Sequence, residues 1–81
     1  MKNTKIKLNF PVLVDGTDYK ELSLRRPKVR DLIAADADND SSAKKEVFMF
    51  ATLSELPIEV IEELDAKDYR SLQEVYQGFL D

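Results

Sequence analysis

An alternating stretch near the amino terminus, interrupted only at Leu13 and Pro11, limits the folds open to this chain. Between Lys5 and Val14 apolar residues recur at every second position, namely Ile6, Leu8, Phe10, Val12 and Val14. This period is typical of a strand with one buried face, and Pro11, which lacks an N–H group, predicts an edge position or a slight bend. Asp15-Gly16 is a hairpin turn signal, because glycine takes positive φ at little cost. A β-hairpin is therefore predicted over residues 5–24, with Leu22 and Leu24 facing inward.

Helical signals follow the hairpin. Pro27 favours a first helical turn, and the apolar stripe of Val29, Leu32, Ile33 and Ala35 is expected to belong to the core. The next helix is apolar almost all round near Phe50, so it is expected at the centre of the core. Ser41 or Ser42 caps this helix and Asp65 caps the last one. The predicted helices span about residues 27–36, 42–55, 57–64 and 66–80. The order predicts an α+β fold, with the hairpin packed against three to four short helices.

The chain has 81 residues, which is enough for a single domain with a modest core. A domain of this size buries a limited share of its surface, so association with other chains is favoured. No apolar run approaches the length of a membrane span, and the amino-terminal residues Met1–Lys5 lead into a strand instead of an apolar leader. A cytoplasmic protein is expected.

Several kinds of chemistry are disfavoured by composition. The chain contains no cysteine and no histidine, so the usual zinc, haem and copper ligands are missing. The segment Asp36–Asp40 resembles the start of a calcium loop, but Ser41 and Val47 stand where glycine and glutamate are needed, which indicates a solvated loop. Carboxylate pairs such as Glu59 and Glu63, or Glu62 and Glu63, lack a nucleophile or a matching base. We expect no enzyme activity, no metal and no cofactor.

Charge is distributed unevenly along the chain. Through Arg30 there are eight basic and three acidic residues, a net charge of +5; from Asp31 onward there are four basic and thirteen acidic residues, a net charge of −9. This polarity favours head-to-tail docking, or a partner that carries its own charged patch. Self-association is therefore one of the expected kinds of contact.

The junction between the second strand and the first helix carries a basic cluster, and the residues predicted to bind a partner are Arg25, Arg26, Lys28 and Arg30. If Pro27 is the first helical residue, Arg26 occupies the cap position, where it offers no acceptor, and such a broken local rule often marks a functional site. Two alternatives remain. The arginines are solvated or pair with acidic groups inside the fold, or the cluster binds nucleic acid. The acidic remainder of the chain disfavours nucleic acid.

The hairpin with Pro11-Val12 and Asp15-Gly16, the run Leu22-Ser23-Leu24-Arg25-Arg26-Pro27 and the segment Val29-Arg30-Asp31-Leu32 resemble the small tail assembly chaperones of Mu-like and related contractile-tailed phages. The similarity continues through Leu53–Leu64 and through Asp65, Asp68-Tyr69, Leu72-Gln73 and Phe79-Leu80. Nearly the whole chain is covered. The family commonly has a glycine before the third helix, where this chain has Glu55-Leu56-Pro57.

The resemblance implies a chaperone that binds the tape measure protein, keeps it soluble and leaves as tube subunits polymerise. The chaperone would act in the bacterial host cytoplasm and be absent from the finished virion. The tail tube protein and a frameshift-extended form of the chain are further implied partners; no small-molecule substrate and no membrane contact are implied. A long helical client suits an apolar groove between short helices. Met49, Tyr69 and Tyr76 are additional contact candidates, since methionine and aromatic residues suit adaptable surfaces.

Overall fold

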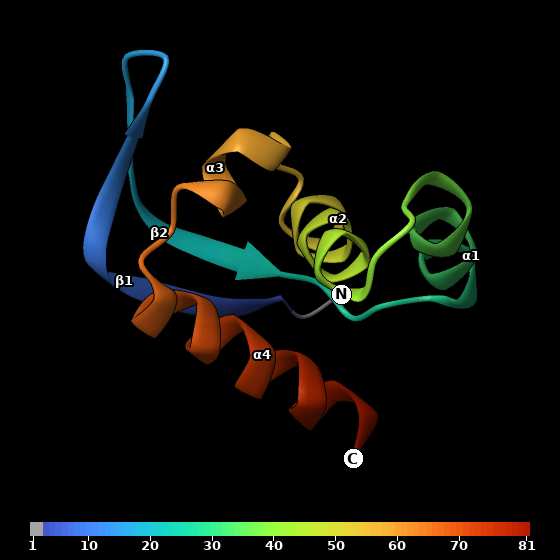
Figure 1. Ribbon diagram of the computed structural model, residues 1–81. Helices are drawn as coiled ribbons and strands as arrows, with labels where there is room; N and C mark the ends of the chain where they lie inside the picture. Colours follow the sequence, from blue (N-terminus) through green and yellow to red (C-terminus); the bar gives the residue numbers. More distant parts are fainter. Residues whose placement is uncertain (1–2) are drawn as a thin grey trace.

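The computed structural model describes residues 3–81; Met1 and Lys2, which belong to the stretch expected to lead into the first strand, lie outside this range. An antiparallel hairpin is followed by four helices, which confirms the predicted α+β fold. The strands are β1 (Thr4–Val14) and β2 (Thr17–Leu24), and the helices are α1 (Val29–Asp38), α2 (Ser42–Ser54), α3 (Ile58–Glu62) and α4 (Ala66–Leu80). The hairpin tip and α1 lie at opposite ends of the molecule (Figure 1).

The hairpin buries one face, as its alternation predicts. Asp15 and Gly16 both have positive φ, of 49° and 79°, which is the geometry of a turn that matches the twist of the strands. The residues buried on the inner face are Ile6, Leu8, Val12, Leu22 and Leu24. The prediction was wrong for Phe10, which is 52% exposed. The strand register shifts between Lys7 and Val12, around Pro11, and this irregularity turns Phe10 away from the core.

Helix α2 supplies the centre of the core, in agreement with its nearly continuous apolar surface. Phe50 is completely buried, and its ring forms edge-to-face pairs with the rings of Tyr69 and Tyr76 from α4, at centroid distances of 5.3 and 5.8 Å. Such edge-to-face pairs stabilise beyond the burial of their area. Other core residues from α2, α3 and α4 are Met49, Leu53, Val60, Ile61 and Leu72. The helices thereby cover the apolar face of the hairpin.

Helix α1 differs from its prediction in both its start and its orientation. It begins at Val29, two residues after Pro27, and lies beside α2 at the end of the molecule away from the hairpin tip (Figure 1). The prediction that its apolar stripe belongs to the core was wrong for Val29, Leu32 and Ile33, which are 71%, 50% and 65% exposed. The buried side chains of α1 include Ala35 and a charged residue, Asp31.

Candidate functional site

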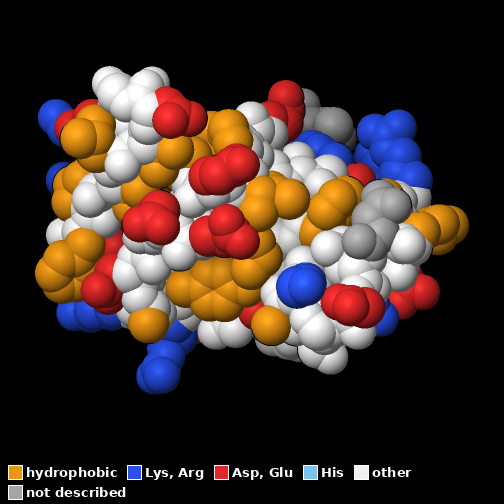
Figure 2. Space-filling model, turned by 45° about the horizontal axis from the view of Figure 1, so that its top comes forward, with side chains coloured by type: hydrophobic (Ala, Val, Ile, Leu, Met, Phe, Trp, Pro, Cys, Tyr) orange, Lys and Arg blue, Asp and Glu red, His pale blue; other side chains and the backbone are white. Residues whose placement is uncertain are grey.

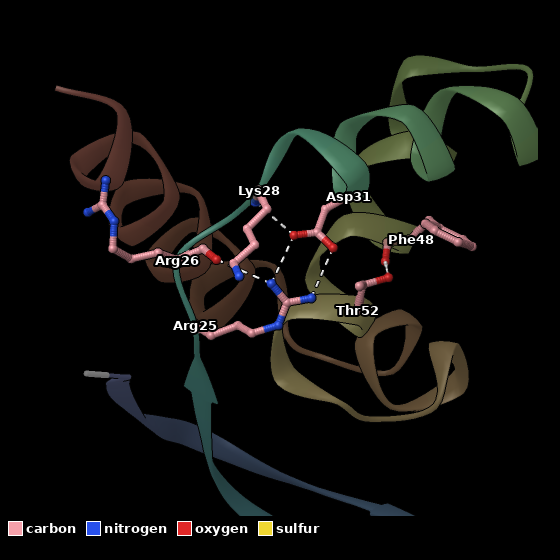
Figure 3. Close-up of polar contacts among 6 residues, drawn as sticks. All are labelled: Arg25, Arg26, Lys28, Asp31, Phe48 and Thr52. Atoms are coloured by element: carbon pink, nitrogen blue, oxygen red, sulfur yellow. Dashed lines mark hydrogen bonds and ion pairs between the residues drawn. The ribbon is translucent and has the colours of Figure 1, made fainter. Parts of the chain in front are cut away.

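The basic junction is built around an ion pair between Arg25 and Asp31. Two guanidinium nitrogens of Arg25 donate to the two carboxylate oxygens of Asp31, at 2.8 and 2.9 Å (Figure 3). Asp31 is 5% exposed, and the Arg25 side chain is 17% exposed. Arg25 also donates to the carbonyl oxygen of Arg26 at 3.2 Å, and its backbone N–H bonds to the carbonyl of Leu53 in α2 at 3.1 Å. The paired geometry fastens the start of α1 to the body of the domain.

The same carboxylate explains where α1 begins. Asp31 accepts the backbone N–H of Lys28 at 2.8 Å, so this N–H, at the amino-terminal end of the helix, has a side-chain acceptor. The cap position is Lys28, which corrects the expectation that Arg26 occupies it. The Asp31 carboxylate thus satisfies the N–H of the cap residue, and the N–H of Asp31 bonds in turn to the backbone carbonyl of Lys28 at 2.9 Å.

Hydrogen bonding favours the ionised form of the Asp31 carboxyl. The bonds from Arg25 lower the pKa of its carboxyl to about 2, against the opposing effect of burial and with help from the backbone of Lys28. Asp31 raises the pKa of the Arg25 guanidinium in turn. The pair is therefore fully charged at neutral pH, and Asp31 engages both terminal nitrogens of Arg25.

The other three predicted cations lie outward. Arg26 donates to the carbonyl of Phe79 near the end of α4 at 3.0 Å, and its guanidinium lies 5.5 Å from the centre of the Phe79 ring. Lys28 and Arg30 are exposed. The fold thus separates the predicted set, because Arg25 pairs inside the molecule, as one alternative proposed, whereas Arg26, Lys28 and Arg30 present charge to solvent.

A groove of about 420 Å³ with an apolar floor lies between α1, α2 and α4, and we call it the apolar groove. Its lining residues are Leu32, Ala35, Asp36, Lys45, Glu46, Met49, Phe50 and Tyr76. At its edge Asp36 pairs with Lys45 at 2.7 Å, and Glu46 accepts the Tyr69 hydroxyl at 2.7 Å. The Asp36 carboxyl, which belongs to the calcium-loop-like segment, has a lowered pKa because of its bond with Lys45. The polar rim is paired and the apolar floor is accessible, which suits a protein side chain better than an ion.

Sequence reasoning identified this groove only in part. Met49 and Tyr76 were named as contact candidates, and both line it. Leu32 was assigned to the core instead. The sequence signal for the outward position of Leu32 is Asp31, which follows Lys28 at the three-residue spacing of a capping box and lies close to Arg25 in the sequence. Because Asp31 faces inward to pair with Arg25, the next residue, Leu32, faces outward.

Metal-binding clusters and membrane-spanning helices are both absent from the described part of the chain. Within residues 3–81, no group of three or more acidic side chains is placed to hold a metal ion. None of the helices described is both long and apolar enough to cross a membrane.

The fold and the groove are those of a small α+β protein in which short helices present apolar surface to solvent. The chain belongs to the phage tail assembly chaperones: the family model described as "Phage tail assembly chaperone proteins, E, or 41 or 14" matches residues 5–81. This family consists of assembly chaperones, so the protein is not an enzyme. Neither a curated protein nor a solved structure matches the chain significantly.

Proposed function

We propose that this tail assembly chaperone binds the tape measure protein of its phage and keeps it soluble until tube subunits enclose it. The observation that carries the proposal is the apolar groove, where Leu32, Met49 and Tyr76 leave an apolar floor open beside a rim in which Asp36 is already paired with Lys45. A tape measure protein is long and helical, and an amphipathic helix places apolar side chains at three- and four-residue spacing into such a groove.

We propose that Arg26 and Lys28, which lie outside the lining of this groove, make the charged contacts with the client. Arg26 lies against Phe79, one helical turn beyond Tyr76, and Lys28 precedes α1. Arg25 supports this surface through Asp31 without facing the client. We extend the proposal to the setting that the resemblance implies, namely a contractile tail, action in the host cytoplasm and absence from the finished virion. The tube protein and a frameshift-extended form are proposed as further partners.

The test is co-expression with the tape measure protein encoded by the same phage, followed by pull-down and by measurement of the soluble client. The variant is Leu32→Asp, which places a charge on the groove floor at a half-exposed position and should leave the fold intact. We expect the wild type to capture and solubilise the client and the variant to lose at least about tenfold in affinity, because the carboxylate must be desolvated.

Leu13→Asp is the matched control, since it makes the same change at an exposed hairpin position. It should retain the client. Failure of the wild type to bind would refute the tape measure as partner, whereas equal losses from both leucine variants would refute the groove as the site.

A further inference from the structure

The outer face of α1 is apolar, exposed and bordered by a cation. Val29 and Ile33 are one helical turn apart and lie on the same side of the helix, with Arg30 beside them. Leu32 lines the apolar groove, and Arg30, two positions earlier, lies on the opposite side of the helix. We define the outer face as Val29, Arg30 and Ile33.

A second groove, of about 290 Å³, lies between α2 and α3, and we call it the acidic groove. Its lining residues are Asn39, Ala43, Lys44, Val47, Phe48, Ile58 and Glu62. Ile58 is 40% exposed, and it stands one turn from Glu62 on the same side of α3. Acidic side chains border apolar surface on the side of the molecule shown in Figure 2. The exposed acids of this segment are Glu55, Glu59, Glu62, Glu63 and Asp65.

The two surfaces have opposite charges, and neither set forms an ion pair within the described part of the chain. Among residues 3–81, the ion pairs include neither Arg30 nor any acid from Glu55 to Asp65. No basic residue occurs in the sequence between Lys45 and Lys67, so the acidic groove has no adjacent cation on α3. Lys44 at its far edge is paired with Asp40 at 3.7 Å.

We infer that the outer face of α1 in one copy docks into the acidic groove of a second copy. Val29 and Ile33 would cover Val47, Phe48 and Ile58, and Arg30 would face Glu62. Each surface combines an apolar residue with a nearby charge: Val29 is next to Arg30 on α1, and Ile58 is one turn from Glu62 on α3. The two charges are opposite in sign. Complementary charges fix the register of such a contact and exclude the reversed arrangement.

The contact joins two different surfaces, so it is head to tail. The opposite side of α1 is fastened to its own domain by the Arg25–Asp31 pair, which keeps its outer face away from the acidic groove of the same chain. A dimer would leave one free outer face and one free acidic groove, and further copies can add at both ends. This inference is independent of the tape measure as client.

Sedimentation velocity over a range of concentrations tests the inference. The wild type should show a weight-average mass that rises with concentration beyond one chain. Arg30→Glu and Glu62→Lys each place like charges in the contact and should weaken self-association at least about tenfold. An equimolar mixture of the two variants should associate again, because the carboxylate introduced on α1 of one variant then faces the ammonium introduced on α3 of the other, and the remaining contacts have the original charges.

Lys7→Glu and Glu74→Lys, which make the same kinds of charge change at exposed positions on β1 and α4, are the controls and should associate like the wild type. Circular dichroism melts check that every variant is folded. A wild type that remains monomeric at millimolar concentration would overturn the inference, and so would a mixture that fails to recover association.

Discussion

At the scale of single residues, Asp68 organises the irregular part of the hairpin. It is completely buried in the first turn of α4, where its carboxylate oxygens accept the backbone N–H groups of Asn9 and Phe10, each at 2.9 Å. The side-chain amide of Asn9 donates to it as well, at 3.0 Å. Burial alone would raise the pKa of Asp68, but these donors lower it. A charge from one end of the sequence thus satisfies N–H groups where the ladder of β1 is interrupted.

Replacement of Asp68 by asparagine is expected to reduce the free energy of unfolding by about 2–4 kcal/mol, because an amide has one acceptor oxygen and leaves a buried N–H unpaired. Urea denaturation measures the change. Asp65→Ala removes an exposed cap that accepts the N–H of Lys67, and it should cost only about 1 kcal/mol. Equal costs for the two variants would show that Asp68 acts merely as a helix cap.

At the scale of elements, the link between α2 and α3 contains a strained residue. Glu55 has φ 59° and ψ 39°, in the left-handed region, and its N–H bonds to the carbonyls of Ala51 and Thr52. Related chaperones are expected to have glycine before the third helix, and glycine adopts this conformation without the clash of a Cβ atom. The charge of Glu55 adds a small contribution to the raised pKa of the Arg25 guanidinium, after the larger effect of Asp31.

Glu55→Gly is therefore expected to raise the free energy of unfolding by about 0.5–1 kcal/mol, measured by thermal and urea denaturation. Glu55→Ala is the matched variant, because it removes the same charge but keeps the Cβ atom. The alanine variant should be no more stable than the wild type. If alanine and glycine behaved alike, backbone strain at this position would be ruled out as the cause.

At the scale of the whole molecule, the acidic groups tie stability to pH. A carboxyl whose pKa is lower in the folded chain than in the unfolded chain contributes fully above the unfolded value, and its contribution is lost as pH falls through the folded value. Asp31, with a pKa of about 2 against an ordinary 3.8, and Asp68 both belong to this class. Stability should be nearly constant above about pH 5 and should decline from there toward pH 2.

Comparison of the wild type with Asp31→Asn isolates the contribution of Asp31. The difference in their unfolding free energies should be larger at pH 7 than at pH 2 by about 2 kcal/mol, because one pKa unit corresponds to about 1.4 kcal/mol. Urea titrations at several pH values between 2 and 7 measure it. A difference that does not change with pH would contradict a charged Asp31–Arg25 pair as its source.

Local patterns account for what could be predicted. Period-two alternation with Asp15-Gly16 was enough for the hairpin, and Ser41 and Asp65 cap α2 and α4 as expected, with bonds to the N–H groups of Lys44 and Lys67. These signals act over a few residues, so a sequence contains them in full. The family resemblance was carried by the strand-to-helix junction and is confirmed by the match over residues 5–81.

The sequence by itself determined the order of elements, the inner face of the hairpin and the position of α2 in the core, because neighbouring residues encode periodicity and capping. Only the tertiary structure decided the orientation of α1, the partner of Asp68 and the conformation of Glu55. In the first two cases a buried charge is satisfied across elements: Asp31 faces Arg25, and Asp68 reaches residues that are 58 and 59 positions away in the sequence. The energetic demand to pair a buried charge outweighs the preference of an apolar stripe for the core, so Leu32 and Ile33 lie at the surface, where this chaperone has its candidate binding faces.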